Sequence, residues 1–406
     1  MASVATTPSL VEPRLRAALA ARPREDRPRS LYLHIPFCFH KCHYCDFYSI
    51  VDRRDRQAAF TDRLVDELSA VGETAGAPLR TIFVGGGTPT LLATDLWRRL
   101  LDALNTRFEV DGDTEFTVEA NPETVTAELL EILVAGGVNR VSVGAQSFNE
   151  RHLETLERWH DPASVDRAVA LIRAAGVRRL NLDLIFGVPG QTLDEWGDDL
   201  ERALDLEPEH LSCYSLTYEP NTPMTERLRR GEFEAIDEDL EARLFEWTGA
   251  RLAAAGFKRY EVSNYARPGE ACRHNLAYWR DEEWLALGPS ASGHAAGIRW
   301  KNAPRLGEYL ESGEGWAPVA EIDDAAPATR LAERLMLGLR LSEGLDASST
   351  LRRAAELGVA DELSHAINAA ATRGHLEATD DRWRLTPAGV LLADRVIAEL
   401  MAAVDP

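Results

Sequence analysis

Short apolar segments recur along the first half of the chain, and each is followed by a segment with helical periodicity. After the first of them, for example, Phe60, Leu64 and Leu68 fall on one helical face. Strands joined through a helix run parallel, because a parallel pair needs a crossover connection. Six such units fall short of the eight of a closed barrel, so they predict an open, partial (β/α)6 barrel of the α/β class. The predicted strands are Leu31–Ile35, Thr81–Val84, Glu115–Glu119, Arg140–Gly144, Leu180–Phe186 and His210–Leu216.

Two of the predicted helices carry start signals. Asp161 followed by Pro162 places an N-cap residue before a proline at the first helical position. Thr192 followed three residues later by Glu195 fits a capping box. Helices are therefore expected to begin directly after Asp161 and Thr192.

The chain is expected to form four parts. Residues 1–29 are rich in Ala, Arg and Pro and predict a flexible arm with one short helix. Residues 30–220 contain the partial barrel, and residues 221–319 extend it with a looser pattern. Residues 320–406 are rich in Ala and Leu and predict a smaller, mostly helical domain with a late hairpin, an outline similar to a winged helix. The hairpin strands are His375–Ala378 and Arg382–Leu385.

The chain is acidic, with 45 basic and 66 acidic residues and a net charge of −21. Such a field repels phosphate backbones and anionic lipids, which argues against nucleic acid and membrane surfaces as main partners. No stretch of about 18 apolar residues occurs, so no membrane span is expected. Three of the five cysteines fall within one short segment, unlike a disulfide framework, and no signal-peptide pattern is present. The sequence therefore predicts a reduced, cytoplasmic protein.

Polar side chains stand at the ends of three predicted strands. Glu119 closes the third strand, and Gln146 follows the fourth. Asn181 and Asp183 share one face of the fifth. A buried carboxylate is costly unless it is paired, so these residues form either a structural hydrogen-bond network or a binding site. Because such barrels place their chemistry at the carboxyl ends of the strands, we favour a site there.

Cys38, Cys42 and Cys45 lie in one loop directly after the first strand. A C-x3-C-x2-C loop can bind three irons of a [4Fe–4S] cluster and leave the fourth without a protein ligand. A small molecule with an amine and a carboxylate could chelate that open iron. The competing interpretation is structural zinc, which prefers four ligands in a closed tetrahedron. Its fourth ligand would be His34, His40 or His43.

A glycine-rich turn, Gly85–Pro89, follows the second strand. Consecutive glycines let the backbone approach a ligand without a Cβ clash, and their amides could bind the amino acid part of a cofactor. A glycine-rich turn alone is a weak signal, because turns use glycine anyway. A zinc site, however, does not explain a cysteine loop after the first strand followed by a glycine turn after the second. The ordered pair therefore favours the cluster.

Seven short segments of the chain stand out when they are taken together. They are Tyr32–Cys38, Tyr44–Phe47, Gly85–Pro89, Glu119–Pro122, Gly144–Phe148, Asp183–Thr192 and His274–Trp279. In this order they resemble the oxygen-independent coproporphyrinogen III oxidase family of radical S-adenosylmethionine (SAM) proteins, and within it the HemW-type haem chaperones. The resemblance covers about residues 30–400 and implies a partial barrel of the radical SAM type.

The resemblance implies a role for each matching residue. Cys38, Cys42 and Cys45 match the ligands of the [4Fe–4S] cluster. Arg158 matches a SAM contact, although Glu157 stands where the family usually has glycine. No residue is assigned a catalytic role. The residues that match SAM contacts are Tyr32, Tyr44, Gly86, Gly87, Thr88, Glu119, Gln146, Arg158 and Asp183.

Two features indicate the haem-chaperone branch of this family. Decarboxylating relatives carry a further cysteine two positions after the third cluster cysteine, where this chain has Phe47. His274 and Tyr278 lie at i and i+4 of one helical turn, and a neutral imidazole can ligate haem iron beside aromatic rings. The alternative is a packed aromatic cluster with a structural histidine, and the resemblance favours haem. The implied haem-binding residues are His274, Asn275, Tyr278 and Trp279.

The leading interpretation is a cytoplasmic protein that binds haem as cargo, holds a SAM-ligated [4Fe–4S] cluster and passes haem to acceptor proteins, with respiratory cytochromes among the candidates. The alternative is a radical SAM enzyme of porphyrin biosynthesis that oxidatively decarboxylates coproporphyrinogen III. A zinc-containing barrel without redox chemistry is the third. Under the leading interpretation, the protein is not expected to have coproporphyrinogen III oxidase activity. Any other catalysis and the formation of a homodimer are left open.

Overall fold

The computed structural model describes residues 11–405, so the first ten residues of the expected flexible arm lie outside it. The chain forms two compact units, and each contains two separate stretches. The first unit contains the chain up to Gly256 together with Glu283–Asp323. The second contains Phe257–Glu282 together with the chain from Asp324 onward. The region between the barrel and the C-terminal helices is thus shared between the two units.

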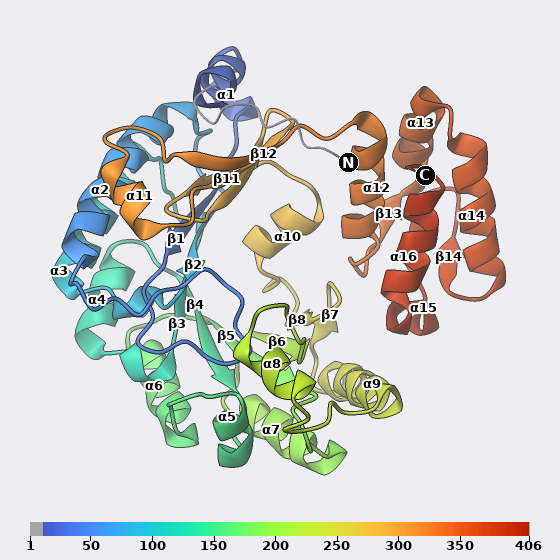
Figure 1. The fold of residues 1–406 in the computed structure, drawn as a ribbon, viewed down its shortest axis with the longest axis horizontal. Helices are drawn as coiled ribbons and strands as arrows, with labels where there is room; N and C mark the ends of the chain where they lie inside the picture. Colours follow the sequence, from blue (N-terminus) through green and yellow to red (C-terminus); the bar gives the residue numbers. More distant parts are fainter. Residues whose placement is uncertain (1–10, 406) are drawn as a thin grey trace. The chain divides into compact units, whose positions relative to one another are not determined.

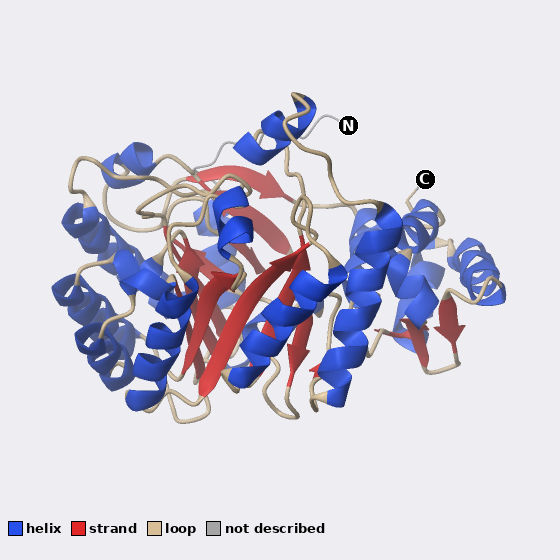
Figure 2. Cartoon of the chain, turned by 90° about the horizontal axis from the view of Figure 1, so that it is seen from below, coloured by secondary structure: helices blue, strands red, loops and turns tan. Residues whose placement is uncertain are grey.

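The core of the first unit is a parallel sheet in the order β6-β5-β4-β3-β2-β1-β9. The six strands expected from the sequence are all present, and helices lie along their outer face (Figures 1 and 2). With the smaller C-terminal domain described below, the predicted α/β class is confirmed. The strands are β1 (Ser30–Ile35), β2 (Thr81–Gly86), β3 (Glu115–Ala120), β4 (Arg140–Gln146), β5 (Arg179–Phe186), β6 (His210–Ser215) and β9 (Leu285–Leu287). The helices are α2 (Gln57–Val71), α3 (Thr94–Arg107), α4 (Ala127–Ala135), α5 (Glu150–Thr155), α6 (Pro162–Ala174), α7 (Leu193–Asp205), α8 (Pro223–Arg229) and α9 (Glu238–Ala254).

Both predicted helix starts are present. The Asp161 side chain accepts a hydrogen bond from the Ser164 N–H at the start of α6. At the start of α7, Thr192 and Glu195 form a reciprocal capping box. These caps satisfy backbone donors that the first turn of a helix leaves unpaired. They fix where each helix leaves its loop.

The strands of the sheet end in step with one another. Ile35 at the end of β1 pairs with Gly86 at the end of β2, and Gly144 on β4 pairs with Asp183 on β5. The loops that follow these strands therefore open at the same edge of the sheet. Residues separated by tens of positions in the sequence meet there.

The stretch Glu283–Asp323 completes the first unit after the chain has formed part of the second. Its strand β9 adds to the sheet beside β1, and three antiparallel strands and a helix follow. The periodic pattern of the sequence did not predict β9, which has only three residues. These later elements are β10 (Ser292–Ala295), β11 (Ile298–Asn302), α11 (Leu306–Glu311) and β12 (Val319–Asp323).

A buried carboxylate on α2 holds this stretch to the barrel. Glu67 accepts hydrogen bonds from the Tyr309 hydroxyl at 2.7 Å, the Gly288 N–H at 3.0 Å and the Ala317 N–H at 3.2 Å. One turn earlier, Arg63 donates to the carbonyl oxygen of Gly315 at 2.9 Å. Burial raises the pKa of Glu67, and the three donors oppose that rise.

The N-terminal stretch contains one helix, α1 (Val11–Ala20), whose Leu15 and Leu19 are fully buried. Between residues 11 and 405, no helix has both the length and the apolar character needed to cross a membrane.

The second unit is mostly helical. Leu335, Trp383 and Leu400 lie in its core. The predicted late hairpin forms the strands β14 and β15 of a small antiparallel sheet in the order β13-β15-β14. The strands are β7 (Lys258–Arg259), β8 (Asn264–Ala266), β13 (Leu345–Asp346), β14 (Leu376–Ala378) and β15 (Arg382–Leu385). The helices are α10 (Arg273–Trp279), α12 (Pro327–Gly338), α13 (Ala347–Leu357), α14 (Ala360–Thr372), α15 (Pro387–Leu391) and α16 (Ala393–Ala402).

Replacing Glu67 by alanine should destabilise the first unit. The change leaves three buried donors without an acceptor, which we expect to lower the free energy of unfolding by about 3 kcal/mol or more. Chemical denaturation followed by circular dichroism measures this loss. Glu73→Ala is the matched control, because the Glu73 side chain is 79% exposed just beyond the same helix. Equal stability of the two variants would contradict the role of Glu67.

Candidate functional site

The cysteine loop is closed by backbone hydrogen bonds at its base. The Cys38 N–H donates to the Ile50 carbonyl oxygen at 2.8 Å, and the Ile50 N–H donates to the Pro36 carbonyl oxygen at 2.8 Å. Within the loop, the Cys45 N–H donates to the Cys42 carbonyl oxygen at 3.3 Å. All three cysteines are free of disulfide bonds and partly buried. The loop therefore holds its three cysteines together at the end of β1.

The electrostatics of the three thiols fit a bound metal cluster. Burial raises the pKa of Cys38, and it raises the pKa of Cys45 to about 11. Negative charge on Cys42 raises both further, so the three sulfur atoms lie close enough to oppose one another's ionisation. Thiolates are the ligands of an iron–sulfur cluster, and a bound cation would offset the negative charge of three neighbouring thiolates. The donor set therefore suits such a cluster.

A chain of polar contacts links two of the thiols across four loops. The Thr88 hydroxyl lies 3.6 Å from the sulfur of Cys38, and the Asn121 amide donates to that hydroxyl at 3.1 Å. Arg158 donates to the Asn121 side-chain oxygen at 2.9 Å and lies 3.5 Å from the sulfur of Cys42. The structure thus brings Thr88 and Arg158 to the cysteine loop. Asn121 was not among the predicted site residues, although it belongs to the Glu119–Pro122 segment that carried the resemblance.

The residue before Arg158 has an unusual backbone conformation. Glu157 has a φ of +55°, in the left-handed region that favours glycine, which accounts for the glycine of the related sequences. The Glu157 carboxylate lies 4.0 Å from Nε2 of His40 and 3.9 Å from Nδ1 of His43, both in the cysteine loop. The departure from the family pattern therefore leaves Arg158 in place.

The glycine turn after β2 is required by close packing within the protein. A Cβ on Gly86, whose φ is +112°, would lie 2.5 Å from the His34 ring. The Gly86 N–H donates to Glu119 at 3.1 Å, and the Gly87 N–H donates to the Ile35 carbonyl oxygen at 2.8 Å. The Thr88 N–H also donates to a backbone carbonyl oxygen. A ligand at this turn would thus meet carbonyl oxygens or the Thr88 hydroxyl, rather than the amides as expected from the sequence.

Two buried carboxylates, Glu119 and Asp183, lie on β3 and β5. Asp183 accepts hydrogen bonds from the Ser142 hydroxyl and the Asn181 amide, both at 2.9 Å. Burial raises the pKa of Asp183. Burial first, and then the charge of Asp183, raise the pKa of Glu119 to about 7. The two interpretations of these polar residues are therefore compatible, since one hydrogen-bond network holds the carboxylates that a ligand would meet.

The remaining predicted SAM residues lie on β4, on β1 and in the cysteine loop. Gln146 has a φ of +64° and follows a bulge in the pairing of β4 with β5, an unusual conformation that turns the chain out of the strand. Tyr32 stacks against Phe83, with ring centroids 6.3 Å apart. Burial raises the pKa of Tyr44, and the charge of Arg158 opposes that rise.

The zinc alternative loses one of its candidate ligands. Nδ1 of His34 lies 3.0 Å from the Tyr32 hydroxyl, and its Nε2 lies 2.8 Å from the Tyr48 carbonyl oxygen. Burial lowers the pKa of His34 to about 4. Both nitrogens are thus engaged in the interior. Throughout residues 11–405, no group of three or more His, Cys, Asp and Glu side chains is placed to hold a single metal ion.

The predicted haem-binding segment forms α10 in the second unit. His274 is buried, and its Nε2 lies 2.9 Å from the Tyr278 hydroxyl. Asn275 donates to the Tyr260 hydroxyl at 3.1 Å. Trp279 lies five residues after His274, about 140° further around the helix, and lines a separate cavity. The structure therefore brings His274 and Tyr278 together, and His274 is not among the residues that line the cavity at Trp279.

Replacing Glu119 by glutamine should weaken the pH dependence of stability. The folded protein holds the Glu119 proton more tightly than the unfolded chain does. The stabilisation that results is therefore complete below pH 4.5 and is lost as the pH rises to about 7. Between these pH values the free energy of unfolding should fall by about 2 kcal/mol less in the variant than in the wild type. Denaturation of the metal-free protein at several pH values measures the difference. Glu128→Gln, whose side chain is 64% exposed, is the control, and identical slopes for all three proteins would refute the shift.

Comparison with known proteins covers both parts of the fold. Residues 32–203 match the radical SAM superfamily, and residues 325–392 match the HemN C-terminal domain. The heme chaperone HemW of Mycobacterium tuberculosis is 38% identical over 386 residues, which cover 93% of this chain and 96% of that protein. The heme chaperone HemW of Escherichia coli is 35% identical over 388 residues, with 92% and 98% covered.

Among solved structures, the radical SAM coproporphyrinogen III oxidase HemN of Escherichia coli has a TM-score of 0.81. It covers 96% of this chain and 92% of its own chain, at 24% sequence identity. That likeness concerns the fold alone. The identity to the HemW proteins, in contrast, extends over more than nine-tenths of each chain. The chain therefore belongs to the HemW family of radical SAM proteins.

Proposed function

We propose that this protein is a cytoplasmic haem chaperone that binds haem, holds a SAM-ligated [4Fe–4S] cluster and delivers haem to acceptor proteins, with respiratory cytochromes among the candidates. The observation that carries the proposal is the similarity to proteins named heme chaperone over 92% or more of the chain. That similarity includes the cysteine loop and the α10 segment alike.

Cys38, Cys42 and Cys45 would hold the cluster. Three observations support this assignment. Backbone hydrogen bonds close the loop, the charge of neighbouring thiols raises the pKa of Cys45, and polar contacts through Asn121 and Arg158 reach the loop. Arg158 would compensate negative charge on the thiolates, because its guanidinium approaches Cys42 directly. With SAM, a bound cluster supplies one-electron chemistry.

SAM would bind at the carboxyl ends of β2 to β5. A carboxylate accepts hydrogen bonds from the ammonium group or the ribose hydroxyls of such a ligand, and Glu119 and Asp183 are placed to do so. Gln146 adds an amide at the same edge, and Tyr32 and Tyr44 add aromatic surface. Gly86, Gly87 and Thr88 would contribute the turn that lies against the methionine part.

Haem would bind through α10. His274 supplies an imidazole for the iron, and ligation has to displace its hydrogen bond with Tyr278. Such a bond contributes only about 1 kcal/mol net, so the exchange is small beside burial of a large apolar ring. Asn275 holds the helix through Tyr260, and Trp279 offers a second contact.

The cysteine loop should bind a four-iron cluster. After anaerobic reconstitution we expect about four iron and four sulfide per chain, because three thiolates leave one iron open. Cys38→Ser, Cys42→Ser and Cys45→Ser should each abolish it, as measured by metal analysis and absorption spectroscopy. Cys213→Ser and Cys272→Ser are the controls, since both thiols are buried outside the loop. One zinc per chain without iron–sulfur absorbance would contradict the assignment.

Haem binding should depend on His274 and should not be accompanied by decarboxylation. His274→Ala should shift the Soret band and weaken haem binding about tenfold, whereas Tyr278→Phe removes the competing hydroxyl and should strengthen it. His365→Ala, an exposed histidine of the same unit, is the control. The protein should release no carbon dioxide from coproporphyrinogen III under anaerobic, reducing conditions with SAM. Release of carbon dioxide would establish the enzyme alternative, which Phe47 in place of cysteine argues against.

A further inference from the structure

The second unit contains a cavity between α10 and α12 that the proposed function has not used. Its volume is about 160 Å³, and it is lined by the end of α10, by α12 and by the strands β13 and β15. We call it the α10–α12 cavity. Its polar lining residues are Trp279, Arg280, Asp281, Arg334, Glu343, Asp346 and Arg382.

Two residues that line this cavity each carry a buried hydrogen-bond donor without an acceptor in the described protein. These donors are Nε1 of the Trp279 indole and Nε of the Arg334 guanidinium. A buried donor left unsatisfied costs about 1–3 kcal/mol, and more when it is charged. Their positions on two different helices, lining one cavity, indicate a ligand that accepts hydrogen bonds from both.

Charges of both signs act on Arg334. Burial lowers the pKa of its guanidinium, and the positive charge of Arg353 lowers it further. Asp281 and Asp346 oppose this but do not reverse it. Asp346 accepts from the Ser349 N–H at 2.6 Å as the N-cap of α13.

The other charged residues at the cavity are also engaged. Arg280 pairs with Glu343 at 3.0 Å, and Arg382 lies 3.5 Å from the Gly344 carbonyl oxygen. Arg334 reaches a neutral partner, the Ser349 hydroxyl, at 3.5 Å. No carboxylate among the described residues forms an ion pair with Arg334 that would satisfy its Nε.

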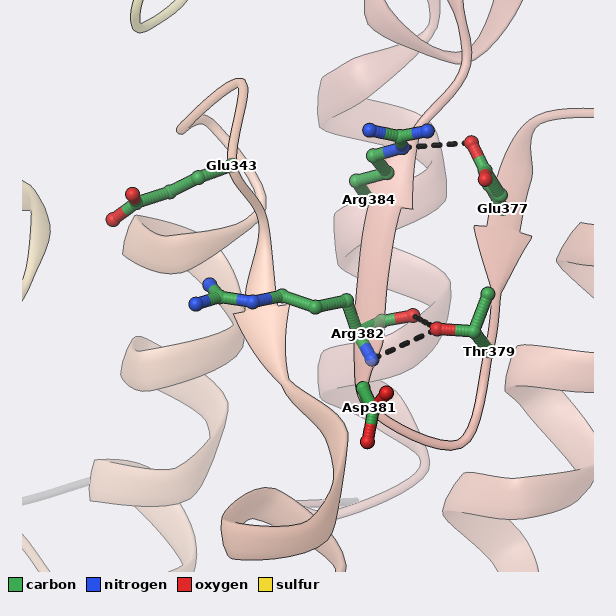
Figure 3. A pocket seen from close by; sticks show the side chains of 6 residues that line it. All are labelled: Glu343, Glu377, Thr379, Asp381, Arg382 and Arg384. Carbon is green, nitrogen blue, oxygen red and sulfur yellow. Dashed lines mark hydrogen bonds and ion pairs between the residues drawn. The ribbon is translucent and has the colours of Figure 1, made fainter.

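The size of the cavity limits the ligand. A volume of about 150 Å³ accommodates a molecule as large as benzene, so this cavity can receive a carboxyl group on a short arm but not a porphyrin ring. A larger pocket of about 470 Å³ shares Glu343 and Arg382 with it (Figure 3). There Arg384 pairs with Glu377 at 2.7 Å, and charged side chains dominate the lining. That lining does not suit an apolar ring either.

We propose that the α10–α12 cavity binds a carboxylate, held by the Trp279 N–H and the Arg334 guanidinium, and that this carboxylate is a propionate arm of the haem cargo. The second clause rests on the proposed function, since haem carries two propionates. Arginine binds a carboxylate through charge-assisted hydrogen bonds, and the indole N–H supplies a further donor. A lone propionate fits the cavity while the ring stays outside it.

The test compares iron protoporphyrin IX with its dimethyl ester, in which both propionates are neutral. We expect the wild-type protein to bind the acid at least about tenfold more tightly than the ester, because a hydrogen bond to a charged group is lost. Arg334→Gln should bind both with the affinity of the ester. Arg330→Gln on the same helix should keep the discrimination, because Arg330 bonds to Ala325 and Asp324 instead. Trp279→Phe, which removes the indole N–H, should reduce the discrimination and provides a second variant if Arg334→Gln does not fold.

A second arm separates this proposal from the haem function. Sodium propionate should raise the melting temperature of the wild type and of Arg330→Gln, but not of Arg334→Gln. If haem does not bind at all but propionate protects through Arg334, the carboxylate site stands and the haem function fails. If Arg334→Gln still discriminates between acid and ester, the proposal is overturned and the haem function stands. Protection by inorganic phosphate in place of propionate would overturn the assignment to a carboxylate.

Discussion

The candidate cofactor site depends on the parallel register of β1 to β5. Because these strands are neighbours in sequence order, each loop at their carboxyl ends opens beside the next. Cys38 and Thr88 are 50 residues apart and meet across the first two strands, and Asn121 meets Arg158 across 37 residues. A slip of one residue by β3 or by β5 would turn Glu119 or Asp183, respectively, to the opposite face of the sheet. Apolar packing fixes the register, and the register places the polar residues.

At this edge, burial raises the pKa of acidic groups. The pKa values of Cys45, Glu119 and Asp183 are all raised, and burial is the largest cause for each. Arg158 brings positive charge to the cysteine loop, where it lowers the pKa of Cys38 and Tyr44. A metal cluster needs its cysteines as thiolates, so loading the loop has to release protons. The same environment that disfavours free thiolates therefore strengthens the preference for a bound cation.

Local patterns in the sequence predicted the features that depend on local chemistry. Alternating apolar runs and helical segments predicted all six strands, and Asp161 and Thr192 predicted their helix starts. The sequence could not predict β9, because three residues have no period and β9 is held by pairing with distant β1. Nor could it show that the Gly86 amide donates to Glu119, since that contact arises only when β2 and β3 are aligned. The resemblance grouped His274 with Trp279, whereas helical geometry separates them.

The geometry of α10 bears on how a carrier protein can release its cargo. A site that buried the whole porphyrin would gain most from the apolar ring and would release it slowly. The α10–α12 cavity is too small for the ring, so only a propionate arm could enter it. The unsatisfied donors of Trp279 and Arg334 make the unoccupied cavity costly, and a ligand that satisfies both would stabilise the second unit. A carboxylate that bound both donors would therefore join α10 to α12.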